Sequence, residues 1–96
     1  TDNRPRALTE AQEHALASVP LRAFIFTRLL QGWSARELQS ACNLSEAAII
    51  EHLLSLERLG LIEVHPGNRV RLLTRRNIEW RKGGAMRVYF NQFAKA

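Results

Sequence analysis

The chain has 96 residues, 46% of them hydrophobic and 24% charged, which is typical of one folded domain and excludes a disordered chain. No apolar run is long enough for a membrane span, no signal peptide is evident, and the single cysteine excludes an internal disulfide, so we expect a cytoplasmic protein. The formal charge of +5 favours a polyanionic partner such as nucleic acid, although solubility alone is the alternative explanation.

Residues 1–7 are polar and contain a proline, so we expect a flexible arm. Arg4 and Arg6 in this arm are candidates for contact with phosphates or a DNA minor groove. The alternative is a frayed terminus without a role.

Two helices are expected next. Thr9 and Gln12 have the spacing of a capping box, which predicts a helix that ends near Ser18. Ser18 is then expected to cap a second helix that carries Pro20 in its first turn and ends at Gly32. The apolar residues of this second helix recur at helical spacing, which predicts a core-facing stripe of Leu21, Phe24, Ile25 and Leu29.

Residues 34–60 contain two further helix starts and a tight turn. Ser34 and Glu37 form another capping-box pattern, and the helix that they begin is expected over about residues 35–42. Asn43 and Leu44 leave room only for a sharp turn before Ser45, which is expected to cap a helix over residues 46–59. Gly60 can then adopt the left-handed conformation that ends many helices.

Residues 61–74 predict a β-hairpin, with a turn signal at Pro66, Gly67 and Asn68. Val70 and Leu72 share one face of the second strand, so Arg69 and Arg71 point to the other. The hairpin and its flank supply candidate contacts to a nucleic-acid backbone, namely Asn68, Arg69, Arg71, Arg75 and Arg76. The alternative is a solvated strand edge guarded by charge.

A connector over residues 75–84 precedes a last helix, expected over residues 85–95. This helix has a strongly amphipathic pattern, with an apolar stripe of Met86, Tyr89, Phe90 and Phe93. The stripe must be buried, either against the first helices of the same chain or against the same helix of a second subunit. Because so small a core has limited surface, we expect a homodimer.

The order of elements resembles the winged helix-turn-helix of bacterial transcriptional regulators. Over residues 34–75 the chain matches the pattern L-S-x-x-x-V-x-x-H-L-x-x-L-x-x-x-G-L-I with Leu44, Ser45, Ile49, His52, Leu53, Leu56, Gly60, Leu61 and Ile62. Residues 67–84 also resemble the tail of proteobacterial regulators in which a Cro/C1-type helix-turn-helix comes first. That resemblance implies an upstream helix-turn-helix in a longer chain, and the absence of a methionine at Thr1 agrees with a fragment.

The resemblance implies a mostly α fold with a small β-hairpin: a winged helix-turn-helix, with a three-helix bundle, a wing and an added C-terminal helix, in one domain over residues 1–96. The function implied is DNA binding by a transcriptional regulator through the helix-turn-helix and a basic wing. The second helix of the motif would then present Ser45, Glu46, Ala47, Ile50 and Glu51 to DNA.

That helix departs from the family pattern, because its solvent side carries acids and aliphatic residues where polar and basic donors are usual. A carboxylate near a phosphate costs about 1 kcal/mol at the dielectric of a protein surface. Ile50 and Leu54 lie one turn apart and would form an exposed apolar patch. The alternative function is therefore a protein-interaction or dimerisation module that keeps the fold without reading bases.

The residues give little support for an enzyme. His14, His52, His65 and Cys42 have no metal-ligand spacing, and no nucleophile lies in a pattern with a base. We therefore expect no catalytic site, no metal and no cofactor, and we expect Cys42 to be a small core residue.

Overall fold

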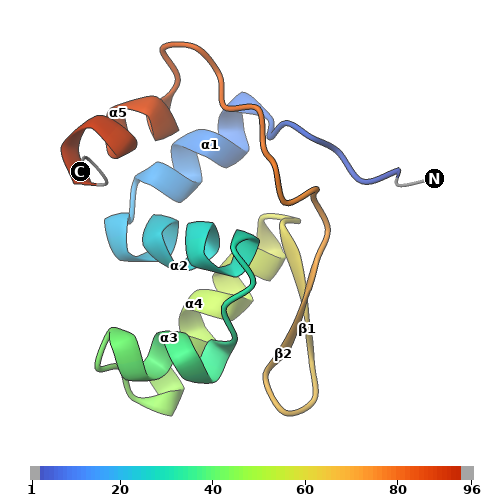
Figure 1. The fold of residues 1–96 in the computed structure, drawn as a ribbon, viewed down its shortest axis with the longest axis vertical. Helices are drawn as coiled ribbons and strands as arrows, with labels where there is room; N and C mark the ends of the chain where they lie inside the picture. The colour runs from blue at the N-terminus through green and yellow to red at the C-terminus, as the bar shows by residue number, and fades with distance from the viewer. Residues whose placement is uncertain (1–2, 94–96) are drawn as a thin grey trace.

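The computed structural model describes residues 3–93, which form five helices and one two-stranded antiparallel sheet (Figure 1). The prediction of a mostly helical domain with one small hairpin is confirmed. The last two residues of the expected C-terminal helix, 94 and 95, lie outside the described residues. The elements are α1 (Glu10–Ala17), α2 (Pro20–Leu30), α3 (Ala35–Ala41), α4 (Glu46–Arg58), β1 (Ile62–His65), β2 (Arg69–Leu72) and α5 (Ala85–Phe93).

The predicted caps of α1, α3 and α4 are formed. The Ser34 hydroxyl accepts from the backbone N–H of Glu37 at 3.1 Å, and the Glu37 carboxylate accepts from the Ser34 N–H at 2.9 Å. Thr9 and Gln12 make the same reciprocal pair at the start of α1. The Ser45 hydroxyl caps α4, so each of these helices satisfies backbone donors that its first turn leaves open.

The expected cap of α2 was wrong. Its N-cap is Val19, which offers no side-chain hydrogen bond, and Pro20 begins the helix. Ser18 instead ends α1, where its hydroxyl donates to the carbonyl oxygen of Ala15 at 2.6 Å. The two helices follow each other so closely that this serine already serves the first of them.

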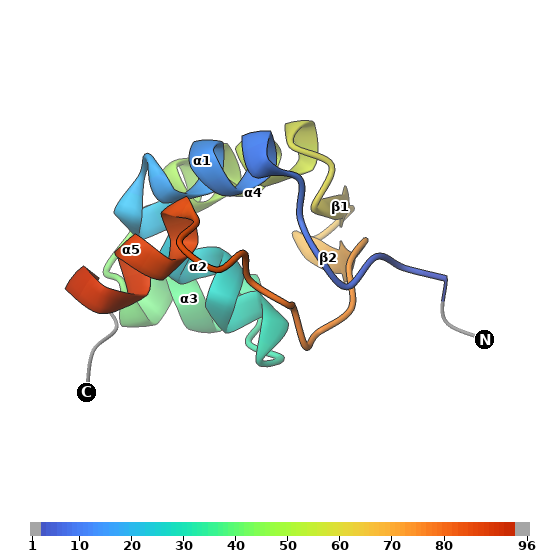
Figure 2. The same cartoon turned by 90° about the horizontal axis from the view of Figure 1, so that it is seen from above.

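The core lies between the four leading helices and the inner face of the hairpin. The stripe predicted on α2 is confirmed in part. Ile25 and Leu29 are buried and Phe24 is half-buried, whereas Leu21 is 37% exposed because its side of the helix is left uncovered. Phe26, beside the stripe, is fully buried. Other fully buried side chains come from the remaining helices and from the start of the hairpin, namely Leu16, Leu38, Ile49, Leu53, Leu56, Leu61 and Ile62. In the view from above, α5 and the hairpin lie on opposite sides of this helical layer (Figure 2).

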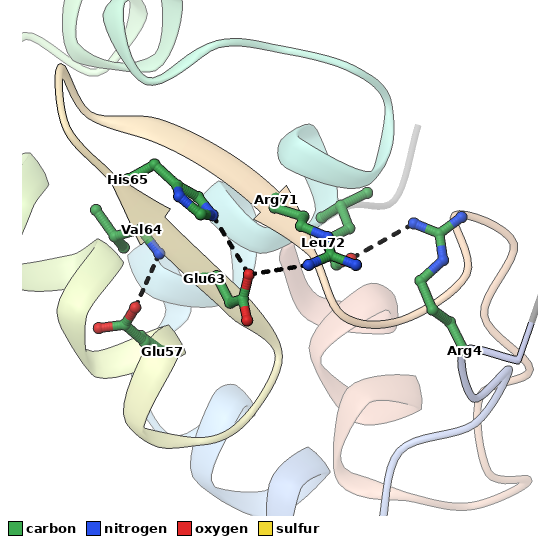
Figure 3. Close-up of polar contacts among 7 residues, drawn as sticks. All are labelled: Arg4, Glu57, Glu63, Val64, His65, Arg71 and Leu72. Carbon is green, nitrogen blue, oxygen red and sulfur yellow. Dashed lines mark hydrogen bonds and ion pairs between the residues drawn. The ribbon is translucent and has the colours of Figure 1, made fainter.

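The strands pair with Ile62 opposite Leu72 and Val64 opposite Val70, so these apolar residues share the inner face of the sheet. The backbone N–H of Val64 donates to the carboxylate of Glu57 at 2.8 Å, which ties β1 to α4 (Figure 3). β2 is therefore the strand whose outer edge faces away from α4.

The segment before α1 does not extend as a free arm. Two backbone hydrogen bonds hold residues 3–7 against the connector, from the N–H of Arg75 to Pro5 (3.0 Å) and from the N–H of Glu79 to Arg6 (2.8 Å). The expectation of a flexible arm over this stretch is corrected accordingly, while residues 1 and 2 lie outside the described part. Both segments lie outside the helices and strands, so their backbone groups can pair with each other.

A buried carboxylate fixes the end of the connector. Glu13 of α1 is 1% exposed, and its Oε2 accepts from the backbone N–H of Arg81 at 3.2 Å and lies 3.5 Å from the Arg81 side-chain Nε. A Cβ on Gly84 would come within 2.9 Å of the other Glu13 oxygen. Glu13 and Gly84 together therefore set where α5 begins.

α5 packs against α1 of its own chain, and this corrects part of the expected subunit interface. Met86 is fully buried and Tyr89 is 5% exposed, so neither side chain is available to a second subunit. Phe90 is half-buried with its ring 5.4 Å from that of Trp80, and Phe93 is 60% exposed. Only the outer part of the stripe remains for a partner.

None of the helices within residues 3–93 has the length and apolar character needed to cross a membrane.

Candidate nucleic-acid interface

A groove with a volume of about 1230 Å³ runs between α3 and the hairpin. One wall is α3 with the turn that follows it, and the other is β2 with the turn at its start. We call this site the α3–hairpin groove. Leu29 and Trp33, from the end of α2 and the loop after it, lie between the two walls.

The lining of the groove is strongly basic. It includes five arginines and a single acidic residue, namely Arg4, Arg36, Arg69, Arg71, Arg76 and Glu46. Amide side chains on both walls add hydrogen-bonding groups, from Gln39 and Asn43 beside α3 and from Asn68 at the hairpin turn. A concave surface with an excess of one charge concentrates its field, so the groove attracts an extended anion.

The two arginines of β2 differ in their surroundings. Arg71 lies opposite Glu63 in the sheet and donates to its carboxylate at 3.3 Å, and His65 contacts the same oxygen at 3.3 Å (Figure 3). These pairs are exposed to solvent and stabilise the fold little, but Glu63 offsets the charge of Arg71. Arg69 is exposed, and its side chain makes no hydrogen bond or ion pair with any residue from 3 to 93.

The arginines after the hairpin have structural roles that the sequence did not indicate. Arg76 donates from Nη1 to the carbonyl oxygens of Leu29 (3.4 Å) and Leu30 (3.1 Å), where a cation complements the negative end of α2. Arg75 donates from Nε to the backbone carbonyl of Arg4 at 3.1 Å and does not line the groove. Both arginine side chains therefore make hydrogen bonds within the fold.

The candidate residues on α4 are divided by the structure. Glu46 lines the groove, while Ser45 is engaged as the cap of the helix. Ala47 and Glu51 are exposed outside the groove, and Ile50 is half-buried against the core. The apolar patch expected on this helix is therefore smaller than predicted, with Leu54 (40% exposed) as its most accessible member.

The residues that sequence reasoning missed lie on α3 and in the turn after it. Arg36 and Gln39 line the groove from one face of the helix, and Asn43 lines it from the turn. Their polar pattern was a usable signal, but nothing in the sequence places the hairpin opposite this face.

Trp33 is the one aromatic residue in the lining; it is half-buried, and Arg28 lies over one face of its ring. The guanidinium of Arg28 lies 5.4 Å from the Trp33 ring and 4.8 Å from the Phe24 ring. Proteins that bind single strands present open aromatic faces on which bases stack. The α3–hairpin groove is therefore better suited to the backbone of a duplex than to unstacked bases.

The histidines and the single cysteine lie outside the groove lining. His52 accepts from Arg22 at 3.3 Å where α4 meets α2, and burial, followed by the charge of Arg22, lowers the pKa of this histidine. Within residues 3–93, no three His, Cys, Asp or Glu side chains gather closely enough to hold a metal ion.

Comparisons with protein-family models, with curated proteins and with solved structures found no match. The groove itself is thus the basis for inferring a function.

Proposed function

We propose that this chain is a DNA-binding domain of a cytoplasmic transcriptional regulator, with the winged helix-turn-helix fold. In this proposal α3 and α4 are the helix-turn-helix, the β1–β2 hairpin is the wing, and the α3–hairpin groove holds the DNA. The observation that carries the proposal is the groove lining, in which five arginines oppose a single glutamate.

The shape of the site supports a duplex. A sugar–phosphate strand is a convex, uniformly charged ridge, and a groove between two projecting elements can accept such a ridge. Arg36 on one wall and Arg69 on the other are both exposed. Their side chains make no hydrogen bond or ion pair within residues 3–93, so each is available to a phosphate.

The test compares two double variants with the same net charge. Arg36→Ala with Arg69→Ala removes one arginine from each wall, and Arg58→Ala with Arg87→Ala removes two exposed arginines away from the groove. Affinity for duplex DNA is measured over a series of salt concentrations. Each phosphate contact contributes about −0.9 to the slope of log K against log salt. The first pair of substitutions therefore makes the slope less negative by about 1.8, and the control pair leaves it unchanged.

Two results would overturn the proposal. If the unaltered protein fails to bind duplex DNA at low salt, the groove is not a DNA site. If both double variants make the slope less negative by the same amount, the affinity for DNA depends on the net charge of the protein and not on the arginines of the groove.

A second function is favoured by one observation, the exposed Leu54 beside Glu51 on the outer face of α4. Acidic and apolar residues suit a protein partner better than phosphate. If α4 is an interaction surface, Leu54→Glu dissociates an oligomer in sedimentation velocity and leaves the salt dependence of DNA binding unchanged.

A further inference from the structure

We infer that Asn43 and Asn68, one from each wall of the α3–hairpin groove, are the residues that read bases in the bound duplex. This inference rests on the proposed function and names the part of the site that gives sequence preference. It moves base readout from the outer face of α4 to the rims of the groove.

The backbone at these two positions is unusual in the same way. Asn43 has φ of 53° and Asn68 has φ of 59°, and within residues 3–93 they are the two residues other than glycine with positive φ. Glycine adopts this conformation without steric cost, whereas asparagine does so at some cost. The turns therefore need only a residue that tolerates positive φ, and glycine would serve both.

The side-chain amides are not used within the fold. Neither Asn43 nor Asn68 makes a side-chain hydrogen bond to any residue from 3 to 93, although both line the groove. Asn43 forms the corner between α3 and α4, and Asn68 lies in the hairpin turn. Two turns distant in the sequence thus present unused amides to one basic site.

Each wall of the groove carries one of these amides and an arginine suited to phosphate contact. Asn68 directly precedes Arg69, and Asn43 lies in the turn after α3, the helix that carries Arg36. In protein–DNA complexes, contacts to phosphate set the register and contacts to base edges supply the specificity. The arginines would hold one backbone strand while the asparagines reach the bases on either side of it.

The chemistry of asparagine selects the base. Its amide offers one acceptor and two donors, and it pairs in bidentate fashion with N7 and the N6 amino group of adenine in the major groove. Glu46, the one residue of α4 in the groove lining, brings negative charge instead. The expected ligand is therefore a DNA duplex with adenine at the position that Asn43 contacts.

The test replaces both residues in ways that preserve the turns. Asn43→Gly with Asn68→Gly deletes the amides and keeps positive φ easy to adopt. Bound sequences are selected from a pool of random duplexes, and the affinity for a duplex without a site is measured in parallel. The unaltered protein enriches an adenine-containing site, and the double variant loses roughly 5- to 150-fold of discrimination per lost contact while non-specific affinity stays within about twofold.

A control and a second variant make the outcomes separable. Asn77→Gly removes an exposed amide outside the groove and leaves the preference unchanged. Asn43→Asp with Asn68→Asp keeps the size of the side chains but removes the amide donors, so it also loses the adenine preference even if glycine loosens a turn. Binding of the unaltered protein without any preference, or a preference that survives both double variants, refutes the inference and leaves the proposed function standing. Failure of the unaltered protein to bind any duplex refutes the proposed function itself.

Discussion

Replacing Met86 by alanine tests whether α5 belongs to the core of its own chain. Met86 is fully buried against the helical layer, so the substitution removes its thioether and leaves a cavity. Changes of this kind cost about 2–5 kcal/mol, a large share of the roughly 5–15 kcal/mol that keeps a domain folded. For a domain of this size each kcal/mol lowers Tm by about 4–8 °C, so even the smallest cost lowers it by about 8–16 °C.

The matched control is Val88→Ala on the same helix. Val88 is 51% exposed, and alanine favours the helix more than valine does, so we expect a change in the free energy of unfolding below about 1 kcal/mol. Urea and thermal unfolding are measured for both variants at two protein concentrations. Equal losses in the two variants would contradict the packing described for α5. A midpoint that rises with concentration would show instead that a second subunit supplies the stability.

Three further predictions follow from the fold. Ser34→Ala removes one half of a reciprocal cap and destabilises the protein by about 1 kcal/mol in urea unfolding, and an unchanged midpoint would show that the cap is not formed in solution. Folding lowers the pKa of His52, so its contribution to stability is present above about pH 6.5 and is lost as the pH falls through the pKa of the folded protein. His52→Gln should flatten this part of the curve of unfolding free energy against pH. A variant curve with the same slope would contradict the role given to His52. Gly84→Ala places a Cβ within 2.9 Å of Glu13 and destabilises the protein by about 1–3 kcal/mol, whereas a neutral result would mean that the connector is not fixed at this point.

Local structure was predictable where the responsible contacts lie within a few residues of sequence. Ser34 and Glu37 satisfy each other's backbone groups across a single turn, so their spacing alone indicates a helix start. The alternation of the second strand likewise gave the inner face of Val70 and Leu72, because side chains of a strand alternate whatever lies beyond it.

Apart from the cap of α2, the errors arose where partners are distant in the sequence. Arg76 donates to the last carbonyl of α2, which lies 46 residues earlier in the sequence. The carboxylate of Glu13, which accepts from the backbone N–H of Arg81, lies 68 residues away. A run of arginines has the same appearance whether its members bind phosphate or complete the fold. Met86 is another example, because its pattern indicates burial but not the surface that covers it.

The residues that line the groove depend on which strand of the hairpin faces it, and that strand is β2. Glu57 binds the backbone of Val64 and so holds β1 against α4. β2 is consequently the strand beside the open side of the domain, and the element opposite it is α3. The basic residues of β2 therefore share a site with Arg36 and Asn43, and most of the outer face of α4 stays outside that site. If α3 and α4 act as the helix-turn-helix that we propose, the usual emphasis on the second helix would direct mutagenesis to the acidic face of α4, whereas the arginines of the groove lie between α3 and the hairpin.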